Sequence, residues 1–183
     1  MISLPMHLNL SMTDPLTTMQ IIILTGQVRS AKTTALQNWL KGRSGAAGIL
    51  SPDIGKLRKF YDIASEDYFD FQIDENTNED LDITRVGRFT FLDSAFKRAN
   101  DILRQAGNSD ADYIIIDELG KLELKKKGLY TSIKYLLDKH NKKELKANLL
   151  IVIRDYLLED AIHFFDLKHY RIVELDASKK LQL

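Results

Sequence analysis

The sequence has no cysteine among its 183 residues and only three prolines. The absence of cysteine excludes disulfide bonds, thiolate nucleophiles and cysteine-ligated zinc or iron–sulfur sites. The four histidines are scattered along the chain, so a histidine-rich metal site is not expected either. Because no Pro-, Gly- or Ser-rich stretch is present, nothing in the chain resembles a linker between domains.

Neither sign of charge is in excess, because Lys and Arg together number 26 and Asp and Glu together also number 26. A general polyanion binder is expected to carry a basic surplus, so the composition does not favour nucleic acid as a partner. The lysine-rich stretch at 125–146 is either a nucleic-acid patch or a solvated helix face. The interspersed Asp138 and Glu144 favour the solvated face. No feature of the sequence identifies a protein partner.

Long apolar runs are also missing. No run approaches the roughly 18 residues that cross a bilayer. No Lys or Arg precedes Arg29, so the N-terminus lacks the positive region of a signal peptide. We therefore expect a cytoplasmic protein without a membrane-spanning segment.

Short apolar strands alternate with amphipathic helices along the chain. The apolar runs that suit buried strands are Gln20–Thr25, Ala46–Leu50, Tyr113–Ile116, Leu149–Ile153 and Tyr170–Leu175. Helical spacing of apolar residues is found at Lys32–Leu40, from Asp93 to Gly107, around Leu129–Leu137 and at Tyr156–Phe165. We expect Asp93 to cap the second of these helices. The alternation predicts an α/β fold with a mostly parallel sheet and helices on both faces. We predict a single domain at residues 19–183, preceded by an irregular N-terminal extension at 1–18.

The segment near residues 55–92 departs from this alternation. Phe60–Ala64 and Tyr68–Ile73 are rich in aromatic and β-branched residues and predict a small antiparallel hairpin insert. An acidic, exposed loop is expected at Asp74–Asp82 and a further strand at Arg85–Leu92. The aromatic side chains either pack in the hairpin core, which is the favoured interpretation, or stack on a base.

The first motif with chemical meaning lies between the first predicted strand and the first predicted helix. It matches G-x-x-x-x-G-K-[ST], except that Ala31 stands where the second glycine belongs. The backbone N–H groups of such a loop, with the helix N-terminus, hold phosphate oxygens. Lys32 would reach the β- and γ-phosphates, and the Thr33 hydroxyl would bind Mg²⁺. The predicted nucleotide-binding residues are Gly26, Gln27, Val28, Arg29, Ser30, Ala31, Lys32, Thr33 and Thr34.

The second motif is a pair of acids, Asp117 and Glu118, after the buried run Ile114–Ile116. Ligands of open α/β folds bind at the carboxyl edge of the sheet, where such acids lie. Asp117 would hold Mg²⁺, directly or through water, and Glu118 would orient or deprotonate the attacking water. The two motifs together predict a nucleoside-triphosphate site.

Four stretches of the chain resemble the THEP-type nucleoside-triphosphatases, small P-loop enzymes that hydrolyse the γ-phosphate of several nucleoside triphosphates. They are Thr25–Thr34, Gly48–Ser51, Arg85–Phe89 and Asp117–Leu124. The last stretch, Asp-Glu-Leu-Gly-Lys-Leu-Glu-Leu, is very close to the family's Asp-Glu-Ile-Gly-Lys-Met-Glu-Leu signature.

The resemblance implies a P-loop NTPase fold of the RecA/ASCE-like class. It also implies Lys32, Thr33 and Asp117 as the phosphate and Mg²⁺ residues and Glu118 as the catalytic acid. Arg85 and Lys121 become catalytic candidates near the γ-phosphate.

The phosphate loop departs from the family pattern, because Arg29 and Ala31 stand in place of two glycines. A residue other than glycine held at positive φ costs on the order of 1–2 kcal/mol. The leading hypothesis is therefore a slow, Mg²⁺-dependent hydrolase of ATP, GTP and other nucleoside triphosphates, with broad base preference.

Two alternatives remain open. One is a nucleotide-binding switch or interaction module with little turnover, and the other is a nucleotide or small-molecule kinase. The kinase is less favoured because no arginine-rich lid follows Glu118. Arg154, after the strand at Leu149–Ile153, is either a γ-phosphate sensor or an exposed residue that closes the strand.

Overall fold

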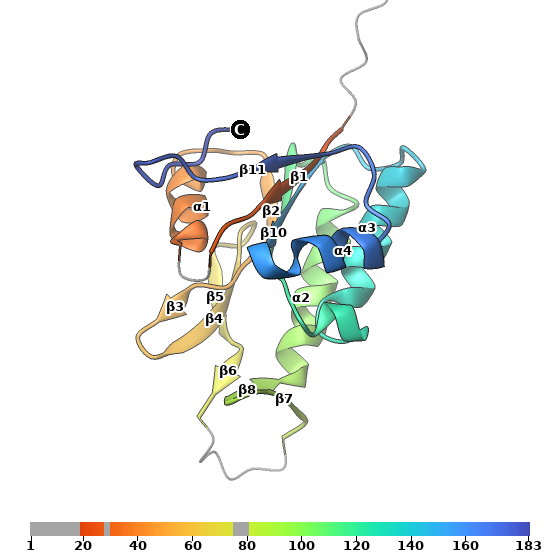
Figure 1. Ribbon diagram of the computed structural model, residues 1–183. Coiled ribbons are helices and arrows are strands. Elements are labelled where there is room, and N and C mark those ends of the chain that lie inside the picture. Colours follow the sequence, from red (N-terminus) through yellow and green to blue (C-terminus); the bar gives the residue numbers. More distant parts are fainter. Residues whose placement is uncertain (1–18, 28–29, 75–80) are drawn as a thin grey trace, which may run out of the picture.

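The computed structural model describes residues 19–27, 30–74 and 81–183. The extension expected at 1–18 and the centre of the acidic loop lie outside these residues. One sheet runs through the described part in the order β11-β1-β10-β9-β2-β4-β3, with β5 paired to β4 (Figure 1). Within the same residues, no helix is both long and apolar enough to cross a membrane.

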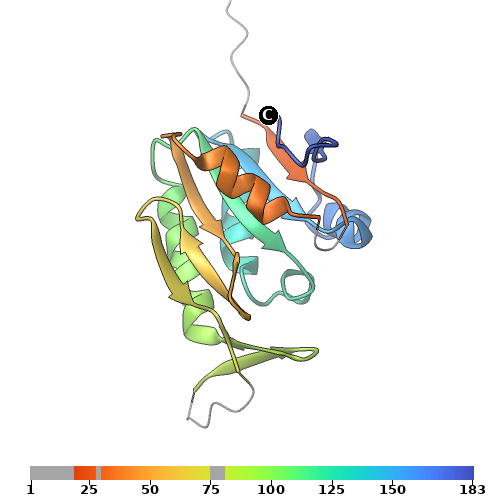
Figure 2. The ribbon, with the colours of Figure 1, turned by 90° about the vertical axis from the view of Figure 1, so that its left-hand side faces the viewer.

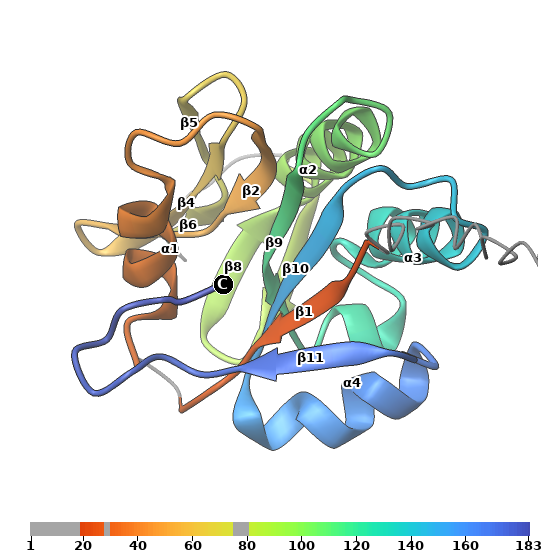
Figure 3. The same ribbon diagram turned by 90° about the horizontal axis from the view of Figure 1, so that it is seen from above.

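Five strands form the parallel part of this sheet, as the alternation of elements predicts. They are β1 (Ile21–Leu24), β2 (Ala46–Leu50), β9 (Tyr113–Leu119), β10 (Asn148–Ile153) and β11 (Tyr170–Val173). All neighbouring pairs among them are parallel. β10 lies between β1, which leads into the phosphate loop, and β9, which carries the two acids (Figure 3).

Helices cover both faces of the parallel strands, as expected (Figure 2). α1 (Lys32–Leu40) packs on one face together with Leu181 near the C-terminus. α2 (Asp93–Ala106), α3 (Tyr130–Asn141) and α4 (Leu158–Phe164) lie on the opposite face. Because both faces are covered, the strands are apolar at successive positions rather than at alternate ones.

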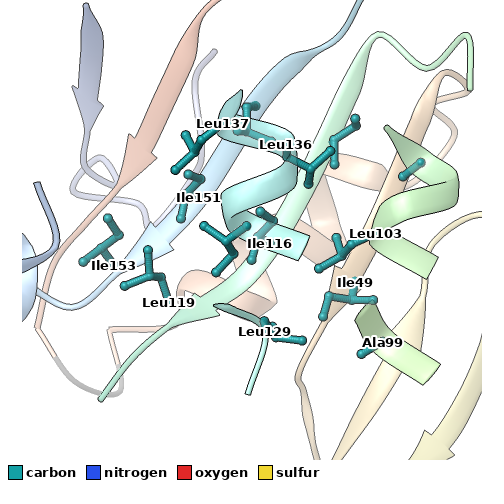
Figure 4. Close-up of a cluster of buried hydrophobic side chains, with 14 of the residues drawn as sticks. Ile49, Ala99, Leu103, Ile116, Leu119, Leu129, Leu136, Leu137, Ile151 and Ile153 are labelled. Carbon is teal, nitrogen blue, oxygen red and sulfur yellow. The ribbon is translucent and has the colours of Figure 1, made fainter. Parts of the chain in front are cut away.

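The larger core lies between the sheet and the three helices of the second face (Figure 4). Leu103 of α2 and Leu136 of α3 pack there with Ile116 of β9 and Ile151 of β10, and all four side chains are fully buried. Full burial of such a side chain contributes roughly 1.5–3 kcal/mol relative to exposure. This packing holds β9 in place.

The predicted antiparallel insert is present, but it has two parts. β3 (Asp53–Ile54), β4 (Leu57–Asp62) and β5 (Asp67–Asp70) extend the main sheet beyond β2. β6 (Gln72–Ile73), β7 (Ile83–Val86) and β8 (Phe89–Leu92) form a separate three-stranded sheet, at the lower end of the molecule in Figure 1. The favoured interpretation of the aromatic residues as core is correct for Phe60, Phe69 and Phe71, which are buried.

Two segments predicted as single strands are each divided. Tyr68–Ile73 is divided at Phe71, where the chain passes from the main sheet to the smaller one; its ring stacks on those of Phe60 and Phe91. Arg85–Leu92 is part of the hairpin of β7 and β8. Its turn contains Gly87 at φ +58°, a conformation that glycine adopts at no steric cost. Sequence periodicity does not reveal either break, because β-branched and aromatic residues lie on both sides of it.

Two helix starts also differ from expectation. Asp93 does not cap α2 but is its first residue, and its carboxylate accepts a hydrogen bond from the Thr84 hydroxyl at 2.7 Å. The helix predicted from Tyr156 begins as the 3-10 turn η2 (Asp155–Leu157), and α4 starts only at Leu158. Apolar spacing does not separate a 3-10 turn from the first turn of an α-helix.

Candidate nucleotide-binding site

The loop between β1 and α1 contains two residues at positive φ. Gly26 has φ +134°, and Ala31 has φ +67° with ψ +24°. Ala31 therefore lies in the left-handed region that favours glycine, at a cost on the order of 1–2 kcal/mol. Val28 and Arg29, which were predicted to bind phosphate, lie outside the described residues.

Lys32 is the first residue of α1 and is only 7% exposed. Its ammonium group donates hydrogen bonds to the carbonyl oxygens of Gly26 and Gln27, both at 2.8 Å, and to Ser30 Oγ at 3.0 Å. Burial lowers the pKa of Lys32, and the nearby Glu118 carboxylate opposes that shift. The cation is held inside the loop, where it would exchange these internal bonds for stronger ones to phosphate oxygens.

Thr33 and Asp117 meet at the carboxyl edge of the sheet. The Thr33 hydroxyl donates to Asp117 Oδ2 at 2.8 Å, and the backbone N–H of Ser51, just after β2, donates to the same oxygen at 3.1 Å. Asp117 is 1% exposed. Burial raises the pKa of Asp117 to about 6, while the two hydrogen bonds oppose the rise. Two separate segments thus donate hydrogen bonds to a carboxylate carried by a third.

This donor set fits Mg²⁺. The ion prefers oxygen ligands and is usually bound through one or two carboxylates together with substrate phosphates. Thr33 and Asp117 supply a hydroxyl and a carboxylate 2.8 Å apart. In the part of the chain that the structure describes, no three His, Cys, Asp or Glu side chains gather into a metal site of their own. Phosphate oxygens would therefore complete the coordination.

Glu118 lies where the pairing of β9 with β10 changes register. Ile116 pairs with Ile151, but Leu119 pairs with Ile153, so β9 has one extra residue between these pairs. Such a bulge changes the direction of neighbouring side chains. The sequence showed the two acids but gave no signal for the bulge between them.

The Glu118 carboxylate forms an ion pair with the Arg154 guanidinium. Arg154 also donates a hydrogen bond to the Tyr156 hydroxyl at 3.3 Å. The sequence left two interpretations open for Arg154. The interpretation as an exposed residue is wrong, because only 23% of its side chain is exposed. Its contact with Glu118 places it beside the predicted catalytic residue, and its role as a γ-phosphate sensor stays a prediction.

Glu123 is a positioning residue to which the sequence motifs assign no role. Its side chain is buried, and its carboxylate accepts hydrogen bonds from the backbone N–H groups of Gly120 at 2.8 Å and Leu129 at 2.9 Å. Burial raises its pKa, and these bonds oppose the rise. Glu123 thereby fixes the segment that carries Lys121. Its place in the Asp-Glu-Leu-Gly-Lys-Leu-Glu-Leu stretch was the available signal.

Arg85 and Lys121 are the two cations that the resemblance implied as catalytic candidates. They lie far apart in the sequence but line the same cavity. The cavity has a volume of about 540 Å³, and Asp117 and Glu118 also line it. The structure therefore brings both cations to the acidic edge of the site. Thr34, by contrast, is exposed at the surface, two residues after the buried Lys32.

Replacing Ala31 with glycine is expected to raise the Tm by about 1–3 °C. The relieved strain of about 1–2 kcal/mol exceeds the added unfolded-state entropy of about 0.4–1 kcal/mol, and about 1 kcal/mol shifts the Tm of a chain of this size by about 2–4 °C. Calorimetry without ligand measures the change. Ala161→Gly, inside α4, is the matched control and should lower the Tm. Equal falls in both variants would show that the loop is adjusted to alanine.

A P-loop NTPase fold is defined by three features of this chain: the strand order, the strand–loop–helix unit formed by β1 and α1, and the acidic strand β9 two positions from β1 in the sheet. The NTPase family model matches residues 21–179. The chain therefore belongs to this family, and the THEP-type resemblance seen in four stretches of the sequence is confirmed. No curated protein matches the sequence.

Two solved structures share the fold. The crystal structure of THEP1 from the hyperthermophile Aquifex aeolicus superposes with a TM-score of 0.64 at 21% identity, over 87% of this chain and 91% of that one. The solution structure of a human cancer-related nucleoside triphosphatase gives a TM-score of 0.60 at 18% identity, over 86% and 89%. The predicted α/β fold class is thereby confirmed.

Proposed function

We propose that this protein is a slow, Mg²⁺-dependent hydrolase that releases the γ-phosphate of nucleoside triphosphates with little base preference. Membership of the NTPase family supports triphosphate hydrolysis in general. The observation that carries the proposal is the hydrogen bond of 2.8 Å between Thr33 and Asp117. It joins the phosphate loop to the acidic strand, and a phosphate-bound Mg²⁺ would need both groups at that distance.

The chain's own residues divide the work of binding. The described backbone of the phosphate loop and the Lys32 ammonium would hold the β- and γ-phosphates. Thr33 and Asp117 would hold Mg²⁺, which supplies neutralisation of the charge that develops on the phosphate oxygens. The buried position of Asp117 and its fixed hydrogen bonds keep this carboxylate in one orientation before any ligand arrives.

Glu118 and Arg154 would act at the γ-phosphate. Glu118 would orient the attacking water and accept its proton. In the described structure the Glu118 carboxylate is paired with the Arg154 guanidinium, so it is engaged with this cation rather than with a water molecule. A γ-phosphate would compete with Glu118 for the guanidinium, so that binding of the triphosphate would release the base. This competition, with the strained Ala31, supports slow turnover.

The test is phosphate release from ATP, GTP, CTP and UTP, each with Mg²⁺ and with excess EDTA. We expect release with all four only when Mg²⁺ is present, and a loss of at least about tenfold in apparent affinity for Mg²⁺ in Asp117→Asn. Asp160→Asn, an exposed residue of α4, is the matched control. Tight triphosphate binding without phosphate release would instead identify a nucleotide-binding switch, and release in EDTA would contradict the metal requirement.

A further inference from the structure

The cavity beside Asp117 and Glu118 extends away from the phosphate loop. Its walls come from β7, β8, the segment after β9 and η2. None of the described residues of the phosphate loop lines it, whereas Ser51 and Asp117, at the metal end of the site, do. A triphosphate held by the loop would therefore direct its γ-phosphate toward this space. The volume of about 540 Å³ lies in the range of small-molecule sites.

The lining is strongly basic. Six of its side chains are cations, and only three are acids. The acids are engaged: Asp117 with Thr33 and Ser51, Glu118 with Arg154, and Glu123 with two backbone N–H groups. The cations are Arg58, Arg85, Lys121, Lys125, Lys127 and Arg154.

Four of these cations have no carboxylate within ion-pair distance among the described residues: Arg85, Lys121, Lys125 and Lys127. Like charges gathered around one space repel one another. The fold holds these four cations around the cavity, because β7 contributes Arg85 and the segment held by Glu123 contributes the three lysines. An anion that enters the cavity would relieve this repulsion.

Aromatic side chains form part of the remaining wall of the cavity. They include Phe60, Phe71, Phe89, Phe91 and Phe96. Phe89 is only partly buried, and the guanidinium of Arg58 lies 5.5 Å from its ring centroid. Because the rings of Phe60, Phe71 and Phe91 stack on one another, Phe89 is the most accessible of the five rings. An aromatic ring beside unpaired cations suits a ligand that combines a planar ring with a phosphate. A nucleoside monophosphate has both parts and the appropriate size.

We propose that this cavity binds a nucleoside monophosphate as a second substrate, whose phosphate accepts the γ-phosphoryl group of the triphosphate at the loop. The inference rests on the proposed phosphate and Mg²⁺ site. An oxygen of the monophosphate forms a bond to the γ-phosphorus, and the bond between that phosphorus and the β-phosphate oxygen breaks. A nucleoside diphosphate leaves with the bonding electrons, and the acceptor becomes a second diphosphate. When the cavity is empty, water takes the acceptor's place.

The sequence does not favour a kinase, because no arginine-rich lid follows Glu118. The structure supplies arginines from other segments: Arg58 from β4, Arg85 from β7 and Arg154 after β10. With the lysines after β9, they surround the same space. The absence of a local lid motif therefore does not count against phosphoryl transfer.

The test has two arms on the full-length protein. Calorimetric titration without triphosphate measures binding of AMP, GMP, CMP and UMP, with orthophosphate and the free nucleosides as controls. ATP radiolabelled at the γ-phosphate, with Mg²⁺ and each monophosphate, then shows where the label goes. We expect at least one monophosphate to bind at submillimolar concentration, more tightly than orthophosphate or its nucleoside, and to receive the label as a diphosphate.

Charge reversal tests the location of the site. Lys125→Glu/Lys127→Glu should weaken monophosphate binding more than about tenfold, because charged hydrogen bonds are lost and replaced by repulsion. Lys142→Glu/Lys143→Glu, at the exposed C-terminal end of α3, makes the same charge change outside the cavity and should not alter it. Melting temperatures of both double variants show whether they fold.

The outcomes separate this inference from the proposed hydrolase. If ATP releases phosphate but no monophosphate binds at millimolar concentration, the inference is overturned and the hydrolase stands. It is also overturned if a monophosphate binds but the label appears only in orthophosphate, or if orthophosphate binds as tightly. If ATP neither binds nor reacts, both the hydrolase and the transfer step fail. Equal weakening in the two double variants would remove the cavity as the binding site.

Discussion

Glu118→Gln is expected to lower kcat for phosphate release by roughly 10²–10⁴, the usual contribution of a positioned acid–base group. The amide keeps the size of the side chain and one oxygen, but it does not accept the proton of the attacking water. The Arg154 guanidinium loses its charged partner and is left free for the γ-phosphate. Because Glu118 acts on the attacking water and not on the phosphates, triphosphate affinity should stay within a few-fold of that of the wild type, and the loss falls on kcat.

Single-turnover phosphate release and triphosphate titration measure the two quantities separately. Glu159→Gln, an exposed acid in the first turn of α4, is the matched control and should change neither. Asp117→Asn should act differently and weaken Mg²⁺-dependent binding, because Asp117 rather than Glu118 contacts Thr33. Hydrolysis that survives Glu118→Gln intact would remove Glu118 from the mechanism. Equal losses of affinity in both variants would contradict the division of roles.

Lys32→Ala is expected to abolish at least about half of the stabilisation by ATP with Mg²⁺. At a ligand concentration about 100 times Kd, binding stabilises the wild type by about 2.7 kcal/mol. Loss of the charged contact to phosphate weakens binding roughly 10- to 100-fold. At the larger loss, the same ATP concentration would stabilise the variant by only about 0.4 kcal/mol. Thermal denaturation over a series of ATP concentrations measures the difference.

Lys41→Ala is the matched control for this experiment. Lys41 lies just after α1 and is exposed, and its ammonium group donates a hydrogen bond to the Asn38 side chain at 2.9 Å. Its removal should leave the response to ATP unchanged. The Tm of each variant without ligand shows whether removal of the buried Lys32 alters the fold itself. An undiminished ATP response in Lys32→Ala would refute the assignment of the phosphate loop.

The sequence by itself determined the elements whose signals are local. Within about twenty residues the chain shows a continuous apolar run, then a loop containing Gly26 and Lys32, then apolar residues at helical spacing. These residues meet the physical requirements of a buried strand, a phosphate loop and a helix in turn. The acids after Ile114–Ile116 are local in the same sense. The parallel sheet follows from the alternation of strands and helices, because a parallel pair needs a crossover between its strands. These predictions needed no knowledge of distant contacts.

Only the tertiary structure decided which distant residues meet. Arg85 and Lys121 share a cavity, Arg154 pairs with Glu118, and Ser51 donates to Asp117. The bulge in β9 and the division of the insert into two sheets are likewise invisible in the sequence. The physical reason is that strand order and register depend on the packing of the whole chain, whereas periodicity describes only neighbours along it. The charge of the cavity is therefore a property of the fold, in a chain whose formal net charge is zero.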